Sequence, residues 1–343
     1  MNKTAGRLLS AFIAISMIIG LFHYGGRILR QTSNDTLVLQ VQTFHSLPKY
    51  SLDVIIYGSS RAWRNVNVMT MYEKYGIGAY NYGSSWQHFN TTALYFHDSL
   101  LTQTPKVAVI ETSMVDKMLP DEDMDAEVLA TAPITNTARK RAFLKECFGN
   151  DIDLYLAYYI PFISFHNNWT ALTKNSFKEN GSPKDFITYM GYHDLASVQE
   201  PQTVDVSLYD HTEFEQYELP QQSIDVLDDI IKTCHDHRID VVFFTAPYRD
   251  EYHYSDAMKE YAREHGCIYL DMFEQMDDAG IDPSTDFWDT GHLNIDGASK
   301  MGDYIGQVIK ENFLIRDMRL VEGNLWSQSS LLEPQEEEVE GEE

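Results

Sequence analysis

The sequence predicts an α/β fold: a doubly wound three-layer sandwich with a mostly parallel central sheet, an N-terminal transmembrane helix and a helical insert. Four apolar runs rich in β-branched residues have the length of strands that are buried on both faces. Segments with the helical spacing of apolar residues lie between these runs, and alternation of strand and helix is typical of this class. A long uncharged segment precedes them all.

The predicted strands and helices follow one another along the chain. The apolar runs are Leu52–Ser60, Lys106–Ser113, Ile239–Pro247 and Cys267–Asp271. Helical spacing of apolar residues marks His88–Gln103 and Ser223–His237, and a last helix is expected to begin near Gly297. Each helix would connect two neighbouring parallel strands, as a doubly wound sheet requires.

The segment from about residue 115 to 220 breaks this rhythm. It contains an acidic stretch, Asp121–Glu127, and an aromatic-rich stretch with helical character, Phe143–Trp169. We interpret it as an inserted helical subdomain or lid. Its aromatic side chains (Tyr155, Tyr158, Tyr159 and Trp169) are candidates for stacking on sugar rings, although most aromatic residues belong to a core.

The N-terminal segment decides the compartment. The 19 residues between Arg7 and Arg27 contain no charged side chain, and as a helix they would span about 28 Å, close to the ~30 Å hydrocarbon core of a bilayer. A buried core helix or a cleaved signal peptide could have the same composition. Arg27 and Arg30 follow instead of a cleavage site with small residues, which favours an uncleaved signal anchor. We therefore expect a single-pass protein of the cell membrane whose globular part lies outside the cytoplasm.

Five regions result from this pattern. Residues 1–30 would hold the cytoplasmic end and the anchor, 31–50 a polar connector, and 51–315 the main domain with the insert at about 115–220. Residues 316–343 would form an acidic disordered tail, because seven of the last eleven residues are glutamates.

Composition excludes several classes of function. The 343-residue chain has 26 Lys and Arg against 52 Asp and Glu, a formal charge of −26, which would repel nucleic acid. Its three cysteines (Cys147, Cys234 and Cys267) show no metal-binding spacing, so neither a disulfide scaffold nor a structural zinc site is expected. The sequence gives no reason to expect a cofactor.

Polar residues that could carry chemistry stand where predicted strands end, the usual place for sites in α/β sheets. Gly58-Ser59-Ser60 follows the first run, Gly83-Ser84-Ser85 follows Tyr80-Asn81-Tyr82, and Glu111-Thr112-Ser113 ends the next run. Asp289 stands three residues before His292, near the last helix. An aspartate at this spacing can orient a histidine ring, whose other nitrogen can then take a proton from a serine.

Each of these features also has a plain structural interpretation. A glycine-serine turn after a strand is common, and Asp289 could simply cap a helix beside an exposed His292. Asp286 lies nearby and could be the cap or the residue that orients the ring. Arg61 and Arg64 could contact an anionic substrate or pair with acidic neighbours. The order of the features along the chain is more informative than any one of them.

That order resembles the SGNH (GDSL-type) hydrolase superfamily, over roughly residues 50–115 and 239–312. The resemblance implies Ser60 as the nucleophile, with Asp289 and His292 completing a triad. It implies the amides of Ser60 and Gly83 as oxyanion donors. The family's asparagine in the third block has no counterpart, and Ser113 is the nearest positional match. Ser59 replaces the aspartate that usually precedes the serine.

The anchor, the variant first block and the large insert resemble a membrane-tethered subgroup related to alginate O-acetylation and lipoteichoic-acid D-alanylation proteins. Such proteins often work beside a multi-span membrane-bound O-acyltransferase. The resemblance therefore implies an extracytoplasmic serine O-acyltransferase or esterase acting on acyl groups of a cell-surface polysaccharide or teichoic acid. Arg61 and Trp169 would be possible substrate contacts, the latter within a His-x-x-Trp segment that begins at His166.

Two other functions are compatible with the same residues. The chain could be a catalytically inactive relative that binds or assembles a polysaccharide-modifying complex, which the variant first and third blocks would suit. A tethered lipase is a weaker candidate. Labelling of Ser60 by an activated-serine probe would separate an inactive relative from an enzyme, and release of fatty acid from lipid esters would test the lipase.

Overall fold

A computed structural model describes residues 3–30, 36–120, 126–177, 189–192, 214–248 and 252–328. Its centre is a five-stranded parallel sheet with the strand order β2-β1-β3-β4-β5. The strands are β1 (Val54–Tyr57), β2 (Ala79–Asn81), β3 (Val107–Glu111), β4 (Asp240–Thr245) and β5 (Ile268–Asp271). The order reverses beside β1, so the carboxyl ends of β1 and β3 border the switch point where α/β sheets usually hold their sites.

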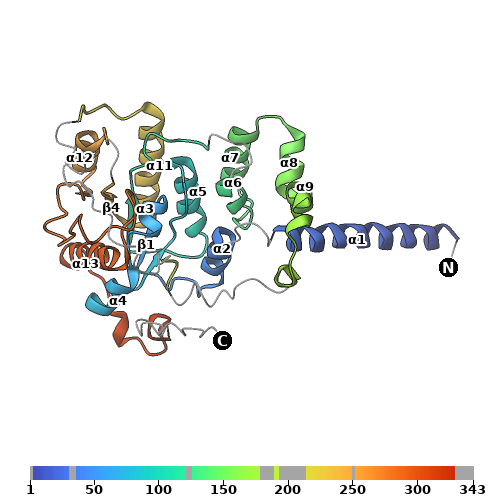
Figure 1. The fold of residues 1–343 in the computed structure, drawn as a ribbon, viewed down its shortest axis with the longest axis horizontal. Helices are drawn as coiled ribbons and strands as arrows, with labels where there is room; N and C mark the ends of the chain where they lie inside the picture. The colour runs from blue at the N-terminus through green and yellow to red at the C-terminus, as the bar shows by residue number, and fades with distance from the viewer. Residues whose placement is uncertain are drawn as a thin grey trace, which may run out of the picture.

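Helices cover both faces of this sheet (Figure 1). α4 (Val68–Tyr75) and α13 (Ile295–Asn312) pack on each other over one face. α5 (Phe89–Ser99) and α11 (Gln221–His237) pack together over the other, with α12 (Ser255–Glu264) beside α11. The predicted doubly wound α/β fold with a parallel central sheet is confirmed.

The core follows from the apolar pattern of these elements. Every residue of β1, β2 and β3 is buried, as expected of parallel strands covered on both sides. On α11 the buried side chains include Leu227, Ile230 and Cys234, which recur every three to four residues and form the stripe that faces the sheet. The three cysteines of the chain are free thiols.

The expected polar connector, residues 31–50, instead contains a buried helix, α2 (Thr36–Ser46). Leu37, Val41 and Phe44 share one face of α2, and the Phe44 ring stacks on Tyr82 with 4.1 Å between centroids. The run of residues 31–35 is entirely polar, and this composition, rather than the spacing of Leu37, Val41 and Phe44, indicated a connector.

The expected acidic tail is also partly wrong, because its first residues belong to the folded domain. The short helices η4 (Met318–Leu320) and η5 (Trp326–Gln328) lie there. Arg316 pairs with Asp53 at 2.8 Å, and the buried Trp326 donates from Nε1 to the Ala79 oxygen at 3.0 Å. The glutamate-rich residues 329–343 lie outside the described residues.

The part of the insert that the structure describes contains helices between residues 126 and 177, while residues 189–192 and 214–220 form turns and irregular backbone. Its elements are α6 (Ala126–Ala130), α7 (Ala138–Phe148), α8 (Ile152–Tyr159), α9 (Pro161–Phe165), η1 (His166–Ala171) and η2 (Lys174–Phe177). Most of the acidic stretch, residues 121–125, lies outside the described residues, as do 178–188 and 193–213. At the N-terminus, α1 (Lys3–Arg30) projects away from the domain (Figure 1), and its segment Ala5–Leu29 is long and apolar enough to cross a membrane.

Candidate active site

The turn after β1 presents Ser60 at the start of a short helix, α3 (Ser60–Trp63). Gly58 has a φ of 141°, and a Cβ atom there would lie 2.5 Å from the Cβ of Glu111. Only glycine fits this backbone conformation at such close approach. Ser59 then caps α3 by accepting a hydrogen bond from the Arg61 amide at 3.2 Å. The chain therefore reverses sharply, which leaves the Ser60 hydroxyl at the carboxyl edge of the sheet.

Glu111, at the end of the neighbouring strand β3, holds this turn through hydrogen bonds. Its Oε2 accepts a hydrogen bond from the Ser59 hydroxyl at 3.0 Å, and its Oε1 accepts one from the Ser113 amide at 2.8 Å. Glu111 and Ser59 are both buried. Buried polar groups with satisfied hydrogen bonds fix a geometry strongly, so Glu111 ties the serine turn to the neighbouring strand.

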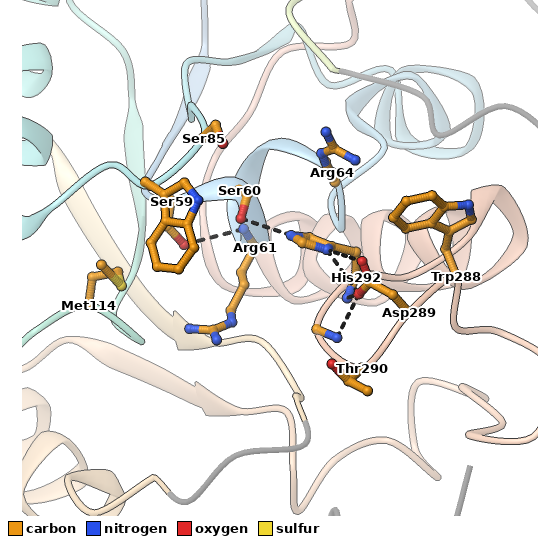
Figure 2. Close-up of a pocket in the computed structure, with 12 residues that line it drawn as sticks. Ser59, Ser60, Arg61, Arg64, Ser85, Met114, Trp288, Asp289, Thr290 and His292 are labelled. Carbon is orange, nitrogen blue, oxygen red and sulfur yellow. Dashed lines mark hydrogen bonds and ion pairs between the residues drawn. The ribbon is translucent and has the colours of Figure 1, made fainter. Parts of the chain in front are cut away.

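His292 reaches Ser60 from a loop 232 residues further along the chain. Its Nε2 lies 2.8 Å from the Ser60 Oγ, and its Nδ1 lies 2.8 Å from the Asp289 Oδ2. The three side chains form one line across the pocket (Figure 2). With Asp289 ionised, the ring proton is on Nδ1, which donates a hydrogen bond to the carboxylate. Nε2 is then free to accept a hydrogen bond from the serine hydroxyl.

Asp289 also organises its own loop. Its Oδ1 accepts hydrogen bonds from the amides of Gly291 and His292, each at 2.8 Å. Burial acts to raise the pKa of Asp289, but the hydrogen bonds that His292 and Gly291 donate outweigh it and lower the pKa below its ordinary value. The carboxylate therefore stays charged and acceptor-only at neutral pH, as a group that orients a histidine must.

Asn65 connects the serine side of the site to the histidine side. It is fully buried just after α3, its Oδ1 accepts a hydrogen bond from the Leu293 amide at 2.9 Å, and its Nδ2 donates to the Gly291 oxygen at 3.4 Å. These contacts hold both neighbours of His292. Asn65 was not singled out from the sequence, because nothing in a local pattern shows that its partners lie more than 220 residues away.

An open pocket of about 490 Å³ surrounds the Ser60 hydroxyl. Its lining residues are Ser59, Ser60, Arg61, Arg64, Ser85, Trp86, Met114, Trp288, Asp289, Thr290, Gly291 and His292. Ser85 belongs to the polar turn Gly83-Ser84-Ser85 that we expected near the site, whereas Trp86, Met114 and Trp288 were not predicted as site residues. These three residues stand in loops next to the predicted site residues. Their position beside those residues was the sequence signal that could have identified them.

Two arginines give this pocket a positive character in an otherwise acidic chain. The Arg61 guanidinium lies over the Tyr248 ring, 3.5 Å from its centroid, and donates to the Ser113 hydroxyl at 3.0 Å. Among the described residues, no carboxylate pairs with Arg64, and its buried Nε has no hydrogen-bond partner. Burial lowers the pKa of Arg64, while nearby Asp289 acts to raise it. Within the described part of the chain, Arg64 is thus a cation that borders the Ser60 pocket without an ion-pair partner.

Gly83 and Ser113 lie close to the site, but neither is among the residues that line the pocket. The Gly83 amide donates to Asn81 Oδ1 at 3.1 Å, and the Ser113 amide donates to Glu111. The Gly83 amide, which we expected to face an oxyanion, is therefore engaged elsewhere, and so is the amide of Ser113, the nearest positional match to the third donor. Ser85, two residues after Gly83, faces the pocket instead (Figure 2).

The structure also shows that Asp289, and not Asp286, lies against the His292 ring. Asp286 accepts from Lys300 of α13 at 2.6 Å and from the Asp282 amide at 2.7 Å, so it ties its loop to α13 and leaves Asp289 to orient His292.

Trp169, expected as a possible substrate contact, lies in η1 and does not line the pocket. The structure therefore places Trp169 outside the Ser60 pocket, because the insert packs η1 against α1. Arg61, the other expected contact, does border the pocket.

Comparison with known proteins adds little to this geometry. No family model and no curated protein matches the chain. One of the solved structures that match is the crystal structure of a candidate acylhydrolase from Bacteroides fragilis NCTC 9343. The two share 13% sequence identity with a TM-score of 0.38, over 79% of this chain and 94% of that one. A likeness this distant says nothing about the chemistry of the pocket.

Proposed function

We propose that this protein is a membrane-anchored serine esterase or O-acyltransferase that works outside the cytoplasm on ester-linked acyl groups of a cell-surface polymer. The observation that carries the proposal is the hydrogen-bonded line Ser60–His292–Asp289 at the edge of an open pocket. A serine hydroxyl on a neutral histidine nitrogen, with the other nitrogen on a carboxylate, is the arrangement that activates a serine for attack on an acyl group.

The first half of the reaction would form an acyl-serine. The Ser60 oxygen attacks the carbonyl carbon of an ester while His292 Nε2 takes the hydroxyl proton, and Asp289 stabilises the resulting imidazolium. The Ser60 amide opens helix α3, where N–H groups have no acceptor within the helix, so it can donate to the oxyanion. Ser85 is the second donor in this proposal, in place of Gly83 and Ser113. His292 then returns the proton to the leaving alcohol.

The second half would remove the acyl group. Water or the hydroxyl of a sugar or polyol loses its proton to His292 and attacks the carbonyl carbon of the acyl-serine. The bond between that carbon and the Ser60 oxygen then breaks, and His292 returns the proton to Ser60. Water gives hydrolysis and a polymer hydroxyl gives transfer. The resemblance to tethered acyl-transfer proteins favours transfer, with a multi-span O-acyltransferase as the partner that supplies the acyl group.

The charge of the pocket indicates the kind of ester. Arg64 beside Ser60 lacks a carboxylate partner among the described residues, and Arg61 faces the same space. A carboxylate or phosphate on the substrate would satisfy Arg64 with charge-assisted hydrogen bonds. Anionic surface polymers, including teichoic acids and acidic polysaccharides, provide such groups.

The experiment measures release of p-nitrophenol from p-nitrophenyl acetate by the full chain in detergent, with and without added glycerol. We expect saturable turnover that is lost in Ser60→Ala and retained in Ser59→Ala to within about tenfold. Glyceryl acetate among the products would indicate transfer, and acetate alone hydrolysis. If Ser60→Ala and the native chain release p-nitrophenol at the same rate, catalysis by Ser60 is excluded. An inactive binding or assembly protein then becomes the better interpretation.

A further inference from the structure

The helical segment α8–α9–η1 (Ile152–Ala171), here called the hairpin, packs against the C-terminal end of α1. The Phe162 ring lies 4.9 Å from the Phe22 ring between centroids, and Asn168 Nδ2 donates to the Leu29 oxygen at 3.2 Å. At Gly26 the backbones approach so closely that a Cβ atom would lie 2.7 Å from the Phe162 nitrogen. The hairpin is therefore attached to the candidate membrane span itself.

The contact lies at the depth of a membrane interface. The uncharged segment of α1 ends at Gly26, just before Arg27. Phe162 contacts Gly26 and also Phe22, which stands one helical turn earlier, about 6 Å further along the axis. Helices that lie in a membrane interface bury their apolar face by about 5–10 Å. If α1 crosses the bilayer, Phe162 is placed within that layer.

The orientation of the hairpin agrees with this depth. In Figure 1, α8 and α9 run across the axis of α1 and form the side of the globular part from which α1 departs. A span along the bilayer normal would place both helices in the plane of the membrane surface. That is the orientation of interfacial amphipathic helices.

The composition of the hairpin also suits lipid. From Leu154 to Thr173 there are 20 residues without Asp, Glu, Lys or Arg, in a chain where 23% of residues are charged. Exposed large apolar side chains on it are Ile152, Leu156, Tyr159, Ile163 and Trp169. Tyrosine and tryptophan favour the boundary between lipid and water. With a net charge of −26, attraction to anionic lipids would not explain contact with a membrane, so apolar insertion must drive it.

We propose that the hairpin is a membrane-interface element whose exposed apolar side chains insert into the lipid headgroup region beside α1 and hold the domain against the bilayer. The proposal requires that α1 spans the membrane, and it is independent of the chemistry at Ser60. The occupant of this apolar surface is expected to be lipid because the hairpin packs directly on α1. A bilayer that surrounds α1 would therefore also contact the hairpin.

Two equally exposed tryptophans provide the test. Trp169 on the hairpin is 67% exposed, and Trp86 at the pocket is 70% exposed. The chain has five tryptophans, none of them in α1. The full chain is reconstituted in phosphatidylcholine vesicles, either plain or brominated near the headgroup end of the acyl chains. Bromine quenches the fluorescence of tryptophans that reach the lipid. The native chain is compared with Trp169→Phe and Trp86→Phe, and flotation confirms that each variant is in the vesicles.

The expected result is that brominated lipid quenches part of the native fluorescence, and that Trp169→Phe loses most of this component. Trp86→Phe should retain the lipid-quenched component within experimental error. In a separate measurement, iodide in the aqueous phase should quench Trp86 and spare Trp169. Equal quenching of Trp169→Phe and the native chain would overturn the proposal and would point to a protein partner on this face. Failure of the native chain to float with the vesicles would overturn both claims, that α1 crosses the membrane and that the hairpin inserts into the headgroup region.

Discussion

Exchanging Asp289 for asparagine isolates the role of one oxygen atom. In the structure, Asp289 Oδ1 accepts from the amides of Gly291 and His292, whereas Oδ2 faces His292 Nδ1 at 2.8 Å. The side chain of an Asp289→Asn variant can keep its carbonyl oxygen on the two amides, so the loop can keep its shape. Its NH₂ group would then face Nδ1, and a donor in that position stabilises the tautomer that carries its proton on Nε2.

The consequence for the reaction can be estimated. A histidine with its proton on Nε2 donates to Ser60 and cannot accept the serine proton, and the imidazolium of the transition state loses its carboxylate. A change of this type lowers kcat by about 10⁴ where the geometry of a triad is otherwise kept. At about 1.36 kcal/mol per tenfold, this corresponds to about 5 kcal/mol of lost transition-state stabilisation. We expect KM to change little, because the pocket is unaltered.

Asp286→Asn is the matched control for this experiment. Asp286 undergoes the same chemical change three residues away, but its carboxylate binds Lys300 and the Asp282 amide. It should lower the melting temperature while leaving kcat within about threefold of the native value. Both variants are measured by steady-state ester hydrolysis, with circular dichroism to confirm folding. A folded Asp289→Asn protein with near-native kcat, or equal losses in both variants, would refute the proposed role of Asp289.

Three further predictions follow from particular contacts. Asn65→Ala removes the contacts to Gly291 and Leu293, so kcat should fall by about 10² with little change in KM; an unchanged kcat would contradict the role of Asn65 in positioning His292. Arg64→Gln should lower kcat/KM for a p-nitrophenyl ester bearing a carboxylate by about tenfold or more relative to p-nitrophenyl acetate; equal losses for both esters would exclude recognition of an anion. Burial lowers the pKa of Lys140 to about 8, below that of the unfolded chain, so the unfolded state binds more protons above that pH. The free energy of unfolding, relative to Lys140→Met, should therefore rise between about pH 7.5 and 9.5 in chemical denaturation, and a flat or falling difference would contradict this.

The sheet could be predicted from the sequence because buried parallel strands carry a continuous apolar signal. The runs that contain β1, β3, β4 and β5 were each identified within a few residues. Ser60, Asp289 and His292, which the structure brings together, were candidates for a related reason, since strand ends and the last loop are where an α/β sheet gathers polar groups, and the resemblance to the SGNH superfamily implied their roles. Local pattern and global fold agree at these positions.

The remaining features depend on contacts that no local pattern records. Gly83 was expected to donate to an oxyanion, but the side chain of Asn81, two residues earlier, takes its amide. Trp169 was expected near the substrate, yet the path of the insert carries it to the end of α1. Trp326 was assigned to a disordered tail because glutamates follow it, whereas its indole fills a site beside β2. For Trp169 and Trp326 a contact with residues distant in the sequence decides the outcome, and for Gly83 it is the orientation of the Asn81 side chain.

Covalent labelling of the full chain with a fluorophosphonate, followed by mass spectrometry of the peptides, addresses the proposed nucleophile most directly. Such a reagent modifies a serine whose hydroxyl is activated by a neighbouring base. We predict a single adduct on Ser60, none on the adjacent Ser59, and loss of labelling in His292→Ala. Absence of an adduct on Ser60 in the folded native chain, or labelling that persists unchanged in His292→Ala, would contradict the proposed chemistry.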